Sequence, residues 1–174
     1  MRNTHDNVII PQIQRIRSTD MGYILDLRKT LGSRPLIMAG AGVILINEKN
    51  EILLQKRRDN LYWDYPAGSM ELGESFEECA RREVLEETGL TCGKLEYFMD
   101  LSGEGSFYEY PNGDKVFLAG ILYICRDFTG ELRSQEDEVI TQRFFPVDAL
   151  PENTPPLKIK ARIFDKVREY LMNE

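Results

Sequence analysis

The sequence predicts a single α+β domain, or a layered α/β sandwich, with a short extension before it. The chain has 174 residues, 42% of them hydrophobic, which is enough for one compact domain and too few for two. Segments with helical apolar spacing interrupt segments with strand character, and short turns join most of the strands. This mixed order lacks the regular alternation of strand and helix that a parallel sheet requires.

The N-terminal extension is expected to contain one short helix. Residues 1–18 show no clear period and predict a tail or an edge strand. A helix then follows from Thr19 or Asp20, either of which suits its N-cap, to Leu31, with Gly32 just past its end. Its apolar side is formed by Met21, Ile24, Leu25, the stem of Arg28 and Leu31. We place the extension at residues 1–35 and the domain at residues 36–174.

Strand patterns dominate the domain. Two apolar runs, 36–46 and 52–54, flank the polar turn 47–50 and predict a β-hairpin. Turn residues 111–114 separate two further strands. The remaining expected elements are strands at 94–101, 106–110, 115–125 and 142–147, and a C-terminal helix at 157–171.

One helix is predicted with defined ends. Ser75 and, three residues later, Glu78 form a capping-box pattern, so the helix should begin at Phe76. Gly89 occupies the position at which a helix commonly ends in a left-handed residue. The helix between them is about three and a half turns long at 3.6 residues per turn.

Three carboxylates share a side of this helix with its apolar residues. At 100° per residue, Glu83, Glu86 and Glu87 fall in the arc that Phe76, Cys79 and Ala80 define. Like charges at this spacing repel one another, so a cation is expected between them. The alternative is an ordinary solvated helix surface in which Arg82 pairs with Glu86 four residues on. Carboxylate oxygens are the ligands that hard divalent ions such as Mg²⁺ prefer.

The same segment resembles the Nudix box. Its fixed positions stand at the family's spacing: Gly68, five residues, Glu74, seven residues, Arg82, Glu83, Val84, Leu85, Glu86, Glu87, Thr88, Gly89 and Leu90. The flanking segments 53–58 and 63–68 are similar to the strand and loop that precede the box, and the resemblance covers roughly residues 36–151. It implies a Nudix-like α/β/α sandwich with a mixed central sheet.

The resemblance also implies a metal site and a reaction. Glu83, Glu86 and Glu87 match the family's ligands for catalytic Mg²⁺, for which Mn²⁺ can substitute, and the backbone carbonyl of Ala67 often assists. Arg82 matches a residue that orients these glutamates, and Glu74 matches one that supports the loop. The implied reaction is hydrolysis of a phosphoanhydride bond, in which a water attacks phosphorus.

The general base is expected in a late loop, because family members often place a glutamate there. The loop 134–139 offers Glu138 as the first choice and Glu136 as the second, and a glutamate of the box is a further alternative. An exposed loop acid without a catalytic role is the competing interpretation of Glu138.

Substrate contacts are expected from basic and aromatic residues. Arg57 and Arg58 are candidates for contact with phosphates, although basic residues at a strand end are often simply exposed. Aromatic residues can stack on a base, and the candidates are Tyr62, Trp63, Phe107, Tyr108 and Tyr110. Tyr108 lies at a distance past the box similar to that of a tyrosine in some dinucleoside-polyphosphate hydrolases.

Composition excludes several other classes. The only histidine is His5, in the polar N-terminal stretch, so Ser-His-Asp and Cys-His machinery is not expected. The net charge of −7 argues against binding extended nucleic acid. The three cysteines lack metal-site spacing and are expected to be reduced, partly buried thiols. Without an apolar leader or membrane-length segment, the chain is expected to be cytoplasmic and not membrane-bound.

The sequence therefore predicts a Mg²⁺-dependent pyrophosphohydrolase that acts on a small nucleotide. Nucleoside triphosphates, nucleotide sugars including ADP-ribose, and dinucleoside polyphosphates all remain open, and a nucleoside monophosphate or its equivalent is released. The alternative is a domain that senses or binds a nucleotide without turnover. A plain Ca²⁺ module is disfavoured because the chain has no EF-hand loop. Many family members are dimers, so the resemblance allows a homodimer, which the residues themselves do not decide.

Overall fold

The computed structural model describes residues 22–103, 105–133, 138–154 and 158–173. The elements, in chain order, are α1 (Tyr23–Leu31), β1 (Leu36–Leu45), β2 (Glu51–Arg57), β3 (Trp63–Asp64), β4 (Ala67–Ser69), α2 (Phe76–Thr88), β5 (Leu90–Cys92), β6 (Glu96–Leu101), β7 (Phe107–Glu109), β8 (Lys115–Cys125), β9 (Phe128–Gly130), β10 (Val139–Pro146) and α3 (Lys158–Met172). The predicted strands and the C-terminal helix are found within a few residues of their expected bounds. Within these ranges no helix is long and apolar enough to cross a bilayer.

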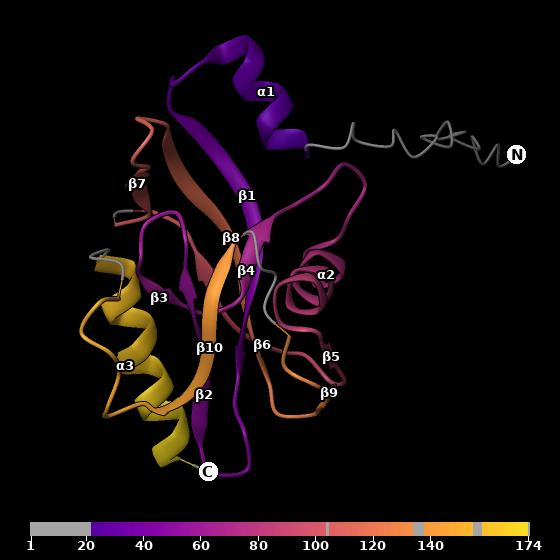
Figure 1. Ribbon diagram of the computed structural model, residues 1–174, viewed down its shortest axis with the longest axis vertical. Helices are drawn as coiled ribbons and strands as arrows, with labels where there is room; N and C mark the ends of the chain where they lie inside the picture. The colour runs from indigo at the N-terminus through magenta and orange to yellow at the C-terminus, as the bar shows by residue number, and fades with distance from the viewer. Residues whose placement is uncertain (1–21, 104, 134–137, 155–157, 174) are drawn as a thin grey trace, which may run out of the picture.

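The strands form a layer between α2 and α3, and α1 lies apart at one end (Figure 1). The central sheet is mixed: β1 pairs in parallel with β8, while β4, β6 and β7 pair antiparallel. A second sheet has the order β10-β2-β3, and β5 pairs with β9. The predicted α+β fold, with helices on both sides of a mixed sheet, is confirmed.

Each main helix covers its own core. On one side α3 contributes Ile163 and Val167 to a cluster with Ile44 and Leu54 of β1 and β2. On the other side Cys79, Ala80 and Val84 of α2 pack with further strand residues, among them Val43, Leu45 and Leu53. Since successive residues of β1 point to opposite sides, both helices fix the same strand. All three cysteines are buried and unpaired.

The predicted hairpin between 36–46 and 52–54 is wrong for most of its length. An antiparallel bridge joins Ile46 to Ile52 around the polar turn, and beyond it β1 and β2 enter different sheets. Residues 41–46 and 52–55 are consecutively buried, which is typical of strands covered on two faces. Such strands pair with distant segments: β1 pairs with β8, and β2 pairs with β10.

The first helix begins later than the expected cap. Thr19, Asp20 and Met21 lie outside the described residues, as does His5. In the described chain Gly22 occupies the N-cap, so no side chain of its own caps the helix. The backbone N–H of Tyr23 instead donates to both carboxylate oxygens of Glu71, at 3.3 Å each. A distant segment therefore caps α1.

Candidate active site

The helix α2 has the two ends that the sequence predicts. Ser75 accepts a hydrogen bond from the backbone N–H of Glu78 at 3.2 Å, and Glu78 accepts one from the backbone N–H of Ser75 at 2.8 Å. Gly89 ends the helix in the left-handed region, with φ of 74°. These two ends fix which residues of α2 turn toward the sheet.

The three box glutamates differ in their burial. The side chain of Glu87 is 3% exposed and that of Glu83 is 14% exposed, whereas that of Glu86 is 53% exposed. Burial, followed by the charge of Glu83, raises the pKa of Glu87 to about 8. Burial also raises the pKa of Glu83, against the opposing charge of Arg82. Burial therefore disfavours the charged forms of Glu83 and Glu87.

Arg82 connects the helix to the loop before it. Its guanidinium donates to Glu74 at 2.6 and 3.0 Å, to Glu83 at 2.6 Å and to Glu86 at 3.1 Å. A further bond reaches the backbone oxygen of Ser69 at 2.9 Å. One planar donor group thus sets the positions of two box glutamates and of the loop.

The strand β4 lies directly against these carboxylates. The backbone N–H of Ala67 donates to Glu87 at 3.0 Å. A Cβ at Gly68 would stand 2.1 Å from the carboxyl group of Glu83, so only glycine leaves room for that side chain. The first glycine of the box is therefore explained by close approach of the backbone.

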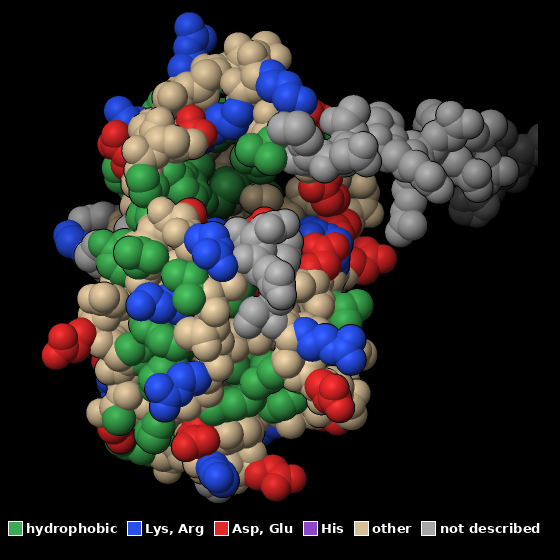
Figure 2. Space-filling model, in the orientation of Figure 1, with side chains coloured by type: hydrophobic (Ala, Val, Ile, Leu, Met, Phe, Trp, Pro, Cys, Tyr) green, Lys and Arg blue, Asp and Glu red, His purple; other side chains and the backbone are tan. Residues whose placement is uncertain are grey.

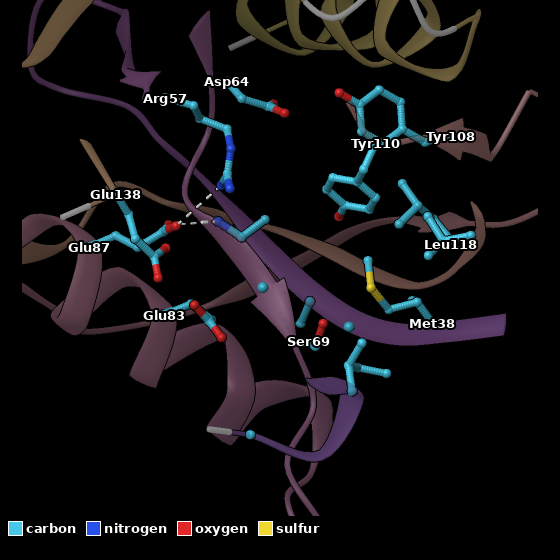
Figure 3. A pocket seen from close by; sticks show the side chains of 18 of the residues that line it. Met38, Arg57, Asp64, Ser69, Glu83, Glu87, Tyr108, Tyr110, Leu118 and Glu138 are labelled. Carbon is cyan, nitrogen blue, oxygen red and sulfur yellow. Dashed lines mark hydrogen bonds and ion pairs between the residues drawn. The ribbon is translucent and has the colours of Figure 1, made fainter. Parts of the chain in front are cut away.

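A cavity of about 660 Å³ begins at this acidic patch. Glu83, Glu87 and Glu138 gather at one end of it, while Met38, Leu118, Tyr108 and Tyr110 lie at the other end (Figure 3). Its volume is in the range typical of sites for small ligands, about 300–1,000 Å³. The cavity is thus acidic at one end and apolar and aromatic at the other.

The two candidate arginines have different positions. Arg57 lines the cavity, with its guanidinium 3.8 Å from a carboxylate oxygen of Glu87 and bonded to Asp59. Arg58 is exposed and does not line the cavity; its backbone N–H donates to the backbone oxygen of Glu138 at 2.8 Å. Arg57 is the last residue of β2 and Arg58 begins the turn after it, which separates the pair.

The candidate base and the candidate aromatic residue both line the cavity. Glu138 is exposed, lines the acidic end and adds its charge to the field at Glu83. Glu136 lies outside the described residues. The hydroxyl of Tyr108 accepts a hydrogen bond from Asn60 at 3.2 Å, and its ring packs edge-on against Tyr110. Of the other aromatic candidates, Tyr62, Trp63 and Phe107 do not line the cavity.

One buried ion pair in the cavity wall was not predicted. Lys160 of α3 donates to Asp64 of β3 at 2.5 Å and lies 3.7 Å from the centre of the Tyr65 ring. Burial alone would lower the pKa of Lys160, but Asp64 and Tyr65 together outweigh it and raise that pKa. The signal in the sequence is a lysine within the apolar stripe of the C-terminal helix, between Ile159 and Ile163.

Replacing Lys160 with methionine is expected to lower the free energy of unfolding by about 3–5 kcal/mol, because Asp64 would be left buried without its cation. Urea denaturation measures this loss. The double variant Lys160→Met with Asp64→Asn should regain part of it, since the unpaired charge is gone. A single-variant loss below about 1 kcal/mol would show that the pair behaves like an exposed one.

The donor set at the acidic end suits a hard divalent cation. Among the described residues no three acidic, histidine or cysteine side chains already converge on one point. Glu83, Glu86 and Glu87 nevertheless offer only carboxylate oxygens on one helix, which are the ligands that hard divalent cations prefer, and burial raises the pKa of Glu83 and of Glu87.

Comparison with known proteins agrees with this geometry. A family model described as the NUDIX domain matches residues 36–166. The chain belongs to the NUDIX domain family. The resemblance that the sequence indicated is thereby confirmed, and the matched range contains α2 with its three glutamates but leaves α1 outside. NUDIX proteins typically depend on a divalent metal ion.

Individual NUDIX relatives share part of the chain. The NAD-capped RNA hydrolase NudC of Actinobacillus succinogenes is 39% identical over 102 residues, which are 57% of this chain and 34% of that protein. The RNA pyrophosphohydrolase of Pelagibacter ubique is 32% identical over 111 residues, 63% of each chain. The chain therefore spans less than two thirds of the length of these curated relatives.

Solved structures share the fold. The crystal structure of MutT NUDIX hydrolase from Burkholderia pseudomallei superposes with a TM-score of 0.64 at 22% identity, covering 77% of this chain and 98% of that one. At this identity the likeness concerns the arrangement of helices and strands alone.

Proposed function

We propose that this chain is a Mg²⁺-dependent pyrophosphohydrolase, with Mn²⁺ as a substitute, that cleaves a phosphoanhydride bond in a small nucleotide. The observation that carries the proposal is the two-ended cavity, with Glu83, Glu86 and Glu87 at one end and an apolar, aromatic end opposite. This polarity directs a diphosphate toward α2 and the nucleoside away from it. Membership of the NUDIX domain family supports the same chemistry.

The cation would be held by Glu83, Glu86 and Glu87, with the backbone oxygen of Ala67 as a further ligand. When bound, a divalent cation supplies charge neutralisation for the phosphate oxygens and makes water a better nucleophile. Arg82 keeps Glu83 and Glu86 on the cavity side of α2 through its bonds to both. Arg57 provides positive charge at the cavity wall, 3.8 Å from Glu87, where a phosphate oxygen can approach it.

The proton of the attacking water goes to a carboxylate, and Glu138 is the proposed acceptor. A new bond forms between the water oxygen and phosphorus while the bridging P–O bond breaks, releasing a nucleoside monophosphate or its equivalent. Glu138 lines the acidic end and lies on a segment separate from α2, so it can accept the proton without serving as a cation ligand. Tyr108 offers an aromatic face to the base.

Replacing Glu138 with glutamine is expected to lower kcat by about a hundredfold, because an amide cannot accept the proton of the attacking water. Steady-state rates would be recorded for this variant and for the control Glu131→Gln, because Glu131 is exposed and does not line the cavity. A kcat within a few-fold of the unaltered chain, or an equal loss in the Glu131 variant, would remove Glu138 from this role.

A substrate panel tests the proposed function. Release of phosphate and of nucleoside monophosphate would be measured with Mg²⁺ for nucleoside triphosphates, ADP-ribose, a nucleotide sugar and a dinucleoside polyphosphate. The names of the two relatives add NAD-capped RNA and a second RNA, without that cap, to the panel. Turnover of at least one compound is expected. Binding without turnover of any of them would instead favour a nucleotide sensor.

A further inference from the structure

The helix α1 precedes the matched NUDIX range and none of its residues is fully buried. It lies across the end of β1 and β8, away from the two cores that α2 and α3 cover (Figure 1). Burial of apolar surface in the core therefore does not hold it in place. Polar contacts from two separate segments do so instead.

The first contact joins α1 to the loop before α2. Glu71 accepts from the backbone N–H of Tyr23 with both oxygens at 3.3 Å. Glu74 in turn accepts from the backbone N–H of Glu71 at 2.8 Å and from Arg82 at 2.6 Å. The start of α1 is thus connected through one short chain of hydrogen bonds to the arginine that positions the box glutamates.

The second contact joins α1 to the turn between β7 and β8. Arg28 donates to the backbone oxygen of Lys115 at 2.7 Å, and its side chain lies 3.6 Å from Asp114. It also donates to the backbone oxygens of Gly32 and Arg34, which closes the end of the helix. The two contacts lie on different segments that both line the cavity, so α1 bridges them.

Between these contacts α1 turns apolar side chains toward the cavity. Ile24 and Leu25 line it together with Met38, Val116 and Leu118 of the sheet. Leu25 remains 51% exposed although it faces the cavity, so its apolar surface has no complete partner within the described chain. Figure 2 shows the hollow beneath α1, with hydrophobic side chains around it.

We propose that α1 is a substrate-specificity wall, in which Ile24 and Leu25 contact the nucleobase of the nucleotide bound in this cavity. The inference rests on the proposed function, because the phosphates are assigned to the acidic end and the base to the opposite one. A nucleobase has flat faces of low polarity, and a wall of aliphatic side chains on one side with Tyr108 on another matches them. The ligand class is a nucleotide whose base is required for tight binding.

The test separates contact with the base from contact with phosphates. Dissociation constants would be measured by isothermal titration calorimetry, with Mg²⁺, for α,β-methylene-ATP and for inorganic tripolyphosphate, which has no base. Ile24→Trp fills the apolar end, and Ile24→Ala removes contacts there without adding bulk. Two variants of the same helix serve as controls, Lys29→Trp and Leu27→Ala, because neither side chain lines the cavity.

Both Ile24 variants are expected to raise the dissociation constant of α,β-methylene-ATP by about tenfold. Ile24→Ala removes an apolar contact with the base, and Ile24→Trp occupies the space that the base needs. Tripolyphosphate should bind all variants as it binds the unaltered chain. With the best substrate of the panel, KM should rise while kcat stays within about twofold, as expected for loss of uniform binding.

Two results would overturn the inference. If the dissociation constants of both ligands rose equally, the Ile24 variants would disturb the whole site. If neither dissociation constant changed, α1 would not contact the base. Failure of the proposed function is distinguishable, because it appears as absence of turnover in the unaltered chain whatever residue stands at position 24.

Discussion

Replacement of Glu86 by glutamine is expected to lower kcat by about two to three orders of magnitude, as for the loss of a principal electrostatic group in an active site. Glu86 is the most exposed of the three box glutamates, and Arg82 at 3.1 Å is its hydrogen-bond partner in the described chain. An amide of the same shape therefore leaves the packing of α2 intact while it removes one of the charges that attract the cation. The measurement is kcat on the best substrate of the panel, with the melting temperature recorded alongside.

The same helix supplies a matched control. Glu77 is also about half exposed, at 55%, and pairs with Arg81 four residues later, whereas Glu86 pairs with Arg82 four residues earlier. Glu77 points away from the cavity, so Glu77→Gln should leave kcat unchanged. Activity of the Glu86 variant within a few-fold of the unaltered chain would contradict the assignment, as would an equal loss in the Glu77 variant.

The second large effect is expected for Arg82→Lys, which should lower kcat by about 10–100-fold, as for the loss of a residue that orients metal ligands. The guanidinium contacts Glu74, Glu83, Glu86 and the backbone oxygen of Ser69 at once. An ammonium group keeps the charge but lacks the planar set of donors, so it cannot hold all of these partners together. We expect the Mg²⁺ concentration needed for half-maximal rate to rise as well.

Arg81→Lys is the control for this substitution. Arg81 also makes several hydrogen bonds, to Glu77 and to the backbone oxygens of Cys92 and Gly93, but on the side of α2 away from the cavity. The substitution Arg81→Lys should lower the melting temperature without changing the Mg²⁺ dependence of the rate. If both lysine variants changed the Mg²⁺ dependence alike, Arg82 would have no special part in positioning the carboxylates.

Local patterns predicted the helix that carries the site. The capping box at Ser75 and Glu78 and the left-handed Gly89 depend on neighbours within a few residues, and both are found as predicted. Helical periodicity alone placed the three carboxylates on the apolar side of the helix; the burial of Glu87 and Glu83 agrees with this, whereas Glu86 is 53% exposed and lies at the edge of that side. The mixed sheet was implied only by the resemblance, because the parallel pairing of β1 with β8 joins segments about 80 residues apart.

What the sequence could not predict depends on distant contacts. The division of the arginine pair, with Arg57 in the cavity and Arg58 outside, is decided by where β2 ends against β10. The pair of Lys160 with Asp64 joins residues 96 positions apart. Glu71 caps a helix 48 residues before it, which no local capping pattern contains. These contacts form only once the layers are packed, so they carry no short-range signature.

We infer that the carboxylates of α2 bind a divalent cation together with a diphosphate. This is tested by isothermal titration of the unaltered chain and of Glu86→Gln with MgCl₂, with and without α,β-methylene-ATP. We expect Mg²⁺ to bind the unaltered chain, to bind it more tightly when the nucleotide is present, and to bind the variant more weakly. We also expect proton release near pH 7, because the cation lowers the raised pKa of Glu87. Identical isotherms for the two proteins, with the nucleotide or without it, would contradict this inference.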